Sequence, residues 1–272
     1  HAAILALIEF QDLEAELERM KSSEHPEDTR LKLNLDNRNP DDGMTDIAYI
    51  KGAFFLRTLE VAAGREQFDT FIKEYFDTHA FKTITTEEFI VYLNTHLLEP
   101  FNIPFNTNEW IYETGLPDNC IRLNSDRLNQ MIAFANRINS GQTIFNGKYK
   151  NLKRGDFISQ EWQTFIRSLN PSISTKLMNE IDAQLKFSTD GNPALKSDWF
   201  CLSVKSGNKS MRPAAKKYLN KIGRRWYIEC IYQSCKDSKD PDDLKWAKNV
   251  FSTAQNNYHF VSKNTIRDIL YN

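Results

Sequence analysis

Apolar residues recur at helical spacing along most of this chain, and the alternating pattern typical of β-strands is nearly absent. The apolar residues of segment 66–77 are Phe68, Phe71, Ile72, Tyr75 and Phe76. Their i, i+3, i+4, i+7, i+8 spacing places them on one face of a helix. A capping box from Thr85 to Glu88 predicts that another helix begins there. The sequence therefore predicts an all-α fold.

Three pairs of a capping residue and a proline divide the second half: Asn170-Pro171, Asn192-Pro193 and Asp240-Pro241. In each pair, we expect the first side chain to accept a free N–H at the helix N-cap. Proline, which has no N–H, suits the first helical position. Successive short amphipathic helices with brief turns predict a stack of antiparallel helix pairs, as in an α-solenoid.

The length of the chain allows more than one domain. Its 272 residues, 40% of them apolar, are enough for a buried core and for two domains. The stretch Gly115-Leu116-Pro117-Asp118-Asn119 breaks the helical periodicity and is predicted to be a linker. We therefore predict one domain over residues 1–120 and a second over residues 121–272.

The charge balance argues against two classes of partner. Thirty-five basic residues face 36 acidic ones, and a net charge of −1 provides no long-range attraction to nucleic acid or acidic lipid. No apolar run approaches the roughly 18 residues that span a bilayer, and the mean hydropathy is −0.56. We expect neither a nucleic-acid nor a membrane partner.

The cysteines do not suggest a disulfide framework. Cys120, Cys201, Cys230 and Cys235 contain no C-x-x-C pair, and on helices they are expected to be small buried apolar residues. No leader sequence is visible, which slightly favours the cytoplasm. An extracytoplasmic location stays open, because a signal peptide could lie in a preceding segment.

The sequence contains no complete set of catalytic motifs. No two of the five histidines stand at the spacing of H-E-x-x-H, so no metal ligands are predicted in this chain. Neither a glycine-rich phosphate loop nor a G-x-S-x-G motif is present. The residues taken alone indicate a helical scaffold. One hypothesis is therefore a helical-solenoid interaction module whose concave face binds peptides or partner proteins.

Three ordered stretches support a different hypothesis. The first is IAYIKGAFFL (47–56) followed by GREQF (64–68); the second runs from Tyr75-Phe76 through FKTITTEEF (81–89); the third combines WIY (110–112) with GLP (115–117). In this order they resemble the late catalytic domain of zinc aminopeptidases of the leukotriene A(4) hydrolase type. Later segments, among them Gly223-Arg224 and Tyr258-His259, resemble that family's C-terminal helical domain.

The resemblance implies the helical remainder of a thermolysin-like catalytic domain, followed by an α-α superhelix (armadillo-like) domain. It also implies a peptidase in which zinc polarises the scissile carbonyl of a peptide substrate and activates water. The family's zinc ligands and general-base glutamate lie upstream of the stretch that matches His1. The chain alone is thus expected to be inactive, and its partner would be the missing N-terminal catalytic half of the same protein. Without that half, Ile4, Leu7 and Ile8 should lie exposed. A non-catalytic family member is a further alternative.

Tyr49 matches the family's catalytic tyrosine, just before Lys51-Gly52. The resemblance implies that its hydroxyl donates a hydrogen bond to the oxyanion of the tetrahedral intermediate. The structural alternative is an aromatic side chain that packs beneath the following helix.

Two further positions match substrate-binding residues of the family. Arg224 matches an arginine that holds the free carboxylate of the substrate, for which a guanidinium fork is well suited. The family usually has a lysine two residues later, where this chain has Trp226. An exposed arginine at a helix C-terminus is the alternative explanation. Asp41 or Asp42 falls where the family has an aspartate at the end of the substrate pocket, although turn chemistry also explains both.

Overall fold

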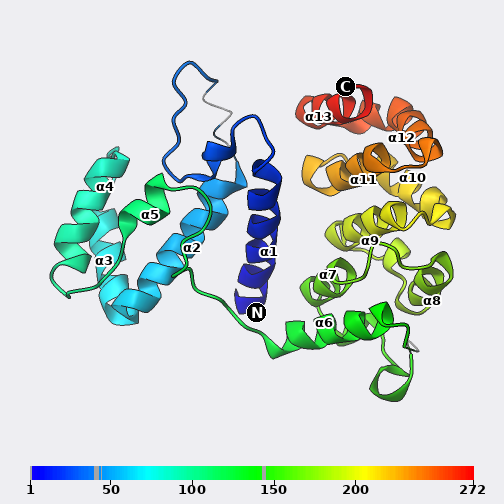
Figure 1. The fold of residues 1–272 in the computed structure, drawn as a ribbon, viewed down its shortest axis with the longest axis horizontal. Helices are drawn as coiled ribbons and strands as arrows, with labels where there is room; N and C mark the ends of the chain where they lie inside the picture. Colours follow the sequence, from blue (N-terminus) through cyan, green and yellow to red (C-terminus); the bar gives the residue numbers. More distant parts are fainter. Residues whose placement is uncertain (1, 40–42, 44, 143–144) are drawn as a thin grey trace. The chain divides into compact units, whose positions relative to one another are not determined.

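The computed structural model describes residues 2–39, 43, 45–142 and 145–272, and all regular structure within these ranges is helical (Figure 1). The predicted all-α fold is confirmed. Contacts within the chain define two compact units, His1–Asn124 and Ser125–Asn272. The division falls shortly after the boundary predicted at residues 120 and 121.

The described residues of the first unit form five α-helices. They are α1 (Ala2–Met20), α2 (Asp46–Ala63), α3 (Arg65–Thr78), α4 (Thr86–Leu93) and α5 (Thr107–Tyr112). A 3-10 turn covers Pro26–Thr29, and a π-helical turn, Asn94–Leu98, directly continues α4. Helix α2 packs against both α1 and α3 and contributes Phe54, Phe55 and Leu59 to the core. At the start of α4, both hydrogen bonds of the predicted capping box form: Glu88 N–H donates to Thr85 Oγ1 (3.2 Å), and Thr85 N–H donates to Glu88 Oε2 (2.8 Å).

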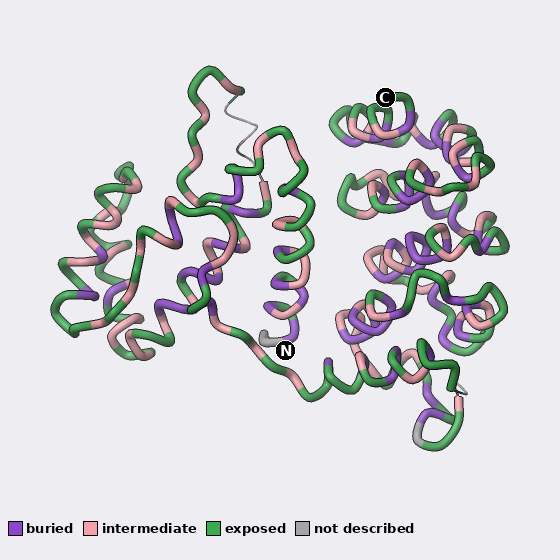
Figure 2. The backbone as a smooth tube through the Cα atoms, in the orientation of Figure 1, coloured by how far each residue is buried: buried purple, intermediate pink, exposed green. Residues whose placement is uncertain are grey.

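The second unit is a stack of helices in two layers (Figure 1). The helices are α6 (Asp126–Asn139), α7 (Ser159–Arg167), α8 (Thr175–Leu185), α9 (Pro193–Lys205), α10 (Arg212–Lys221), α11 (Arg225–Asp237), α12 (Pro241–Ala254) and α13 (Phe260–Tyr271). Short 3-10 turns at Gly147–Tyr149, Arg154–Asp156, Phe187–Thr189, Lys209–Met211 and Gln255–Asn257 join several of them. In one layer, α6, α7, α9, α11 and α13 each pack against the next, and α10 packs against α12 in the other. Buried and exposed positions alternate along each helix (Figure 2). This arrangement is the predicted α-α superhelix.

Two of the three predicted proline caps are confirmed. Asn192 Oδ1 accepts the N–H groups of Ala194 and Leu195 at the start of α9, and Asp240 Oδ1 accepts one at the start of α12. The prediction at Asn170-Pro171 is wrong. Asn170 Oδ1 accepts from Ser172 within a turn, and α8 begins only at Thr175, where Ser174 is the cap.

The predicted linker is part of the first unit. Trp110 Nε1 donates to Asn119 Oδ1 (3.1 Å), which ties the Gly115–Asn119 stretch to α5. Just beyond it, Cys120 is buried in the core of that unit, and Ile121 N–H donates to Thr58 Oγ1. Turn residues therefore break the helical periodicity here without releasing the backbone from the unit.

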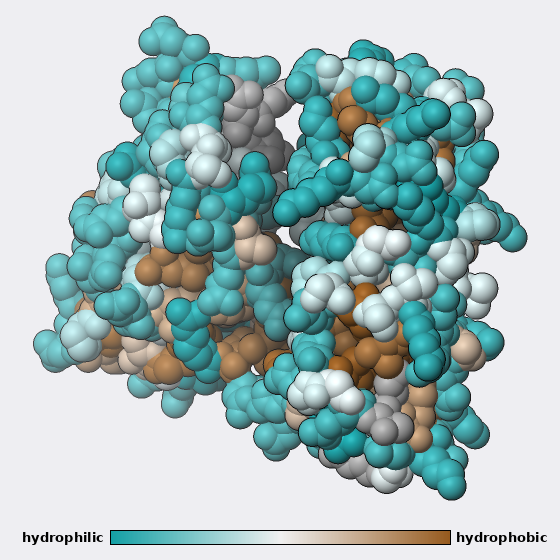
Figure 3. Space-filling model, turned by 45° about the vertical axis from the view of Figure 1, so that its right-hand side comes forward, coloured by the Kyte–Doolittle hydropathy of each residue, from teal (hydrophilic) through white to brown (hydrophobic). Residues whose placement is uncertain are grey.

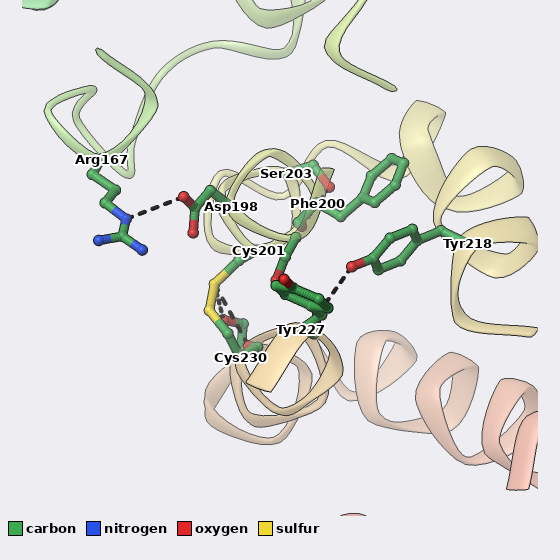
Figure 4. The surroundings of a disulfide bond; sticks show 10 residues. Arg167, Asp198, Phe200, Cys201, Ser203, Tyr218, Tyr227 and Cys230 are labelled. Atoms are coloured by element: carbon green, nitrogen blue, oxygen red, sulfur yellow. Dashed lines mark hydrogen bonds and ion pairs between the residues drawn. A yellow bond between two sulfur atoms is a disulfide. The ribbon is translucent and has the colours of Figure 1, made fainter. Parts of the chain in front are cut away.

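The prediction of four buried thiols is wrong for two cysteines. Cys201 on α9 and Cys230 on α11 form a disulfide with Cα atoms 5.9 Å apart (Figure 4). The pairing was not visible in the sequence because the two residues are 29 positions apart and meet only when α9 packs against α11. Cys120 and Cys235 are free and buried, as predicted.

The expectation of exposed apolar residues at the start of α1 is also wrong. Ile4 and Ile8 are buried, and Leu7 is half-buried. In α1, the large apolar residue that lies exposed is Leu5.

Candidate active-site surface

Helix α2 presents two different faces, and the candidate catalytic tyrosine lies on the outer one. The buried face carries Ile47, Lys51, Phe54, Phe55, Thr58 and Leu59. Tyr49, Gly52, Ala53 and Leu56 recur at helical spacing on another side of the same helix. The motif Tyr49-x-Lys51-Gly52 is thus divided: its lysine points into the unit, and its tyrosine points out.

The outer face of α2 borders a largely apolar hollow of about 950 Å³. Its other walls come from α3 and the start of α4, through side chains such as Phe68, Ile72, Phe76 and Phe89. Gly52 and Ala53 line the hollow one turn after Tyr49, and their small size leaves space beside the tyrosine. Apolar side chains also reach the surface in patches on both units (Figure 3). A hollow of this size suits an organic ligand or a peptide side chain.

Tyr49 stands at the edge of this hollow with 66% of its surface exposed. An aromatic side chain that stabilised the core would be buried, so the packing alternative does not describe this residue. An oxyanion donor must be reachable by a substrate, and the exposure of Tyr49 is compatible with that requirement.

The role of Lys51 was not predicted from its sequence pattern. Its side chain is fully buried, and its Nζ donates to the backbone carbonyls of Thr29 (2.9 Å) and Glu113 (3.0 Å). Thr29 Oγ1 in turn accepts from Gly115 N–H (3.1 Å). A single ammonium therefore joins α2, the turn Pro26–Thr29 and the segment after α5. The available signal was its position, four residues after Ile47 and three before Phe54 in an otherwise apolar stripe.

Burial has a marked electrostatic effect on this lysine. Loss of hydration lowers the pKa of Lys51 from 10.5 to about 8, and repulsion from Arg30 acts in the same direction. Glu113 opposes the change only weakly. The two carbonyl acceptors make burial of the group tolerable, because a buried polar group without partners would cost considerably more.

Arg224 lies in the second unit, at the N-cap position of α11. Its guanidinium carbon lies 5.4 Å from the centroid of the Tyr227 ring, and the side chain is exposed. The alternative explanation placed this arginine at a helix C-terminus, where the helix dipole would stabilise it. The structure contradicts that placement, since α10 ends at Lys221 and Arg224 immediately precedes α11, where the dipole disfavours a cation.

The backbone around Arg224 is held by close packing. A Cβ atom on Gly223 would come within 2.7 Å of the Asn257 carbonyl oxygen and 3.1 Å of the Tyr258 ring, so glycine is required there. Two segments that carry the family resemblance, Gly223-Arg224 and Tyr258-His259, therefore meet in space. After Arg224, the Tyr227 carbonyl accepts from Ser197 Oγ (2.7 Å) and Tyr218 Oη (3.4 Å), which fixes the first turn of α11 (Figure 4).

The remaining predicted positions contribute less. Trp226, at the position of the family's lysine, is 49% exposed and supplies no second cation. Asp41 and Asp42 lie outside the residues that the structure describes. Tyr49 belongs to the first unit and Arg224 to the second.

The described part of the chain does not fit a zinc site. Over residues 2–39, 43, 45–142 and 145–272, no three His, Cys, Asp or Glu side chains come together in a group that could hold a metal ion. No reaction step can be assigned to a metal held by these residues. Within the same ranges, none of the helices has both the length and the apolar character required to cross a membrane.

Comparison with protein families matches both units. Residues 6–110 match the peptidase family M1 domain, and residues 157–270 match the C-terminal domain of leukotriene A4 hydrolase. Leucine aminopeptidase 2-1 of Meyerozyma guilliermondii is 24% identical over 276 residues, which cover 96% of this chain and 44% of that protein. Leucine aminopeptidase 2 of Aspergillus niger is 26% identical over 222 residues, covering 76% of this chain and 34% of that protein.

Solved structures show the same fold. Yeast LTA4 hydrolase in complex with bestatin superposes with a TM-score of 0.81 at 20% identity, over 99% of this chain and 46% of the yeast chain. Native leukotriene A4 hydrolase from Saccharomyces cerevisiae gives 0.75, also at 20% identity, over 98% of this chain and 46% of that chain.

The fold and the two domain matches together point to one class of similar proteins, the hydrolases of peptidase family M1. Within that class, the chain is similar to the leukotriene A4 hydrolase type, which confirms the resemblance predicted from the three ordered stretches. This family consists of hydrolases and implies zinc in its full-length members. The chain spans less than half the length of the relatives described above.

Proposed function

We propose that this chain is the C-terminal part of a zinc-dependent aminopeptidase that releases N-terminal residues from peptides. The observation that carries the proposal is the position of Tyr49, exposed at the edge of an apolar hollow while the adjacent Lys51 anchors the same helix from inside. An exposed phenol on a firmly held helix can donate to a developing oxyanion without reorganisation of the backbone. The match of residues 6–110 to the peptidase family M1 domain supports the assignment.

The division of roles follows from the residues present. Tyr49 would stabilise the oxyanion, and Arg224 would bind the substrate's free carboxylate, a task to which its exposed guanidinium is suited. The zinc ligands and the general base would come from a preceding segment, because the described residues offer no metal site. On this proposal, the chain by itself neither binds catalytic zinc nor hydrolyses peptides.

The test uses the complete protein that contains this chain, assayed with a panel of aminoacyl 4-nitroanilides. Tyr49→Phe removes only the hydroxyl, and we expect kcat to fall by roughly 10²–10³ with little change in KM. The matched control is Tyr271→Phe, which removes a hydroxyl from an exposed tyrosine of the second unit and should leave kcat unchanged. Both variants should retain the wild-type circular dichroism spectrum and melting temperature.

Two results would redirect the proposal. Wild-type turnover in Tyr49→Phe would remove the catalytic role of the tyrosine. A complete protein that binds no zinc and hydrolyses none of the substrates would instead favour a non-catalytic family member or the helical interaction module.

A further inference from the structure

The disulfide between α9 and α11 is asymmetric, and this inference is independent of the proposed function. Cys201 is 4% exposed, whereas Cys230 is exposed. Cys230 lies in the interior of α11, where neighbouring turns cover the backbone, so its exposed area belongs chiefly to the side chain. The bond therefore joins a cysteine that is exposed to one that is buried.

We propose that Cys230 is a thiol-exchange site at which a low-molecular-weight thiol such as glutathione opens the disulfide. Exchange requires a thiolate to approach one sulfur from the side opposite the bond that breaks. Burial blocks that approach at Cys201 and leaves it open at Cys230. The thiolate sulfur forms a bond with Cys230 Sγ, and the Cys201–Cys230 bond breaks with its electron pair passing to Cys201 Sγ. The glutathione sulfur is oxidised to the disulfide level and Cys201 is reduced to a thiolate, so glutathione is the reductant and no other redox partner is needed.

The surroundings of Cys201 can stabilise it as the leaving group. Ser234 Oγ lies 3.2 Å from Cys201 Sγ and can donate a hydrogen bond to the thiolate as it forms. After the thiolate takes a proton from solvent, the Cys230 carbonyl oxygen, 3.6 Å away, can accept from the new thiol (Figure 4). The buried sulfur is thus provided with both a donor and an acceptor.

The native packing between α9 and α11 should survive opening of the bond. Ser197 Oγ of α9 still donates to the Tyr227 carbonyl of α11 (2.7 Å). Tyr218 Oη of α10 lies within hydrogen-bond distance of both the Pro193 carbonyl of α9 (2.8 Å) and the Tyr227 carbonyl of α11 (3.4 Å). Because these contacts are independent of the disulfide, exchange at Cys230 would modify a folded protein.

The experiment exposes the whole chain, purified without reductant, to reduced glutathione and locates the adduct by peptide mass spectrometry. We expect the adduct on Cys230. Cys120 and Cys235 serve as internal controls, because both are buried thiols and stay unmodified as long as the fold is intact. An adduct on Cys201, or four free thiols in the starting protein, would overturn the proposal.

Replacing one cysteine at a time tests the accessibility of each sulfur separately from the reactivity of the disulfide bond. In Cys201→Ser, the free Cys230 should react with N-ethylmaleimide more than about tenfold faster than the free Cys201 of Cys230→Ser. Equal rates would contradict the proposal. Ser234→Ala should slow glutathione exchange by about fivefold, the effect of one lost hydrogen bond, whereas Gln233→Ala, an exposed neighbour on α11, should not. An unchanged rate in Ser234→Ala would refute the leaving-group role assigned to Ser234.

Discussion

The buried ammonium of Lys51 makes the first unit more stable as the pH rises, whereas a lysine in a surface ion pair loses its stabilising effect as the pH rises. In the folded chain the pKa is about 8, against an ordinary value of 10.5. Between these values the unfolded chain binds more protons than the folded one, so the free energy of unfolding rises with pH. Each pKa unit corresponds to about 1.4 kcal/mol, which gives a gain of about 3 kcal/mol from pH 8 to pH 10.5.

The variant that isolates this effect is Lys51→Met, which keeps all but one atom of the length of the side chain and removes the titrating group. Other groups also titrate over this range, so the informative quantity is the difference in unfolding free energy between wild type and variant. We expect that difference to change by about 3 kcal/mol in favour of the wild type as the pH rises. Lys73→Met, at an exposed position on α3, controls for the loss of a lysine from the surface.

A local probe of unfolding is available within the same unit. Cys120 is buried in its core, so pulse labelling of this thiol in increasing urea reports the opening of the first unit separately from the second. The measurement is repeated at several values between pH 7.5 and pH 10.5. A difference between wild type and Lys51→Met that varies by less than about 1 kcal/mol would refute the burial argument.

Three further substitutions test the packing described above. Gly52→Ala should stabilise the first unit by about 0.5–1 kcal/mol, because a Cβ there meets only Leu31 at 3.9 Å; destabilisation would show that the helix tolerates no side chain at this position. Asn192→Ala should lower the free energy of unfolding of the second unit by about 1 kcal/mol, since two N–H groups at the start of α9 lose their acceptor. Labelling of the Cys235 thiol in increasing urea measures this unfolding. Cys201→Ser should lower the free energy of unfolding of the same unit by about 3–4 kcal/mol, because the disulfide closes a loop of 29 residues and so reduces the entropy of the unfolded chain. A loss below about 1 kcal/mol would contradict this stabilisation by the disulfide.

The division of the Tyr49-x-Lys51-Gly52 motif between two faces explains why its residues occur together. A helix that offers a side chain to a substrate must itself be held in place, and Lys51 does so through two carbonyls from distant segments. Gly52 then leaves space next to the tyrosine. Under the proposed function, one helical turn would combine the oxyanion donor, its anchor and the room for a ligand.

Local chemistry was readable from the amino-acid order. Helices follow from apolar spacing and from caps such as Thr85 and Asn192, because these signals act through hydrogen bonds among residues at most four apart. Tyr49 was identified through the ordered resemblance to a family, and helical periodicity alone would not have distinguished it from a packed aromatic residue.

The tertiary structure decided what depended on residues far apart in the chain. Lys51 finds acceptors 22 and 62 positions away, and Cys201 pairs with Cys230 only across two packed helices. Asn170 followed by Pro171 has the sequence pattern of a helix N-terminus, yet the Asn170 side chain accepts a hydrogen bond within a turn instead. Such outcomes depend on which surfaces meet when the helices pack, and a sequence pattern that repeats every three or four residues contains no information about that choice.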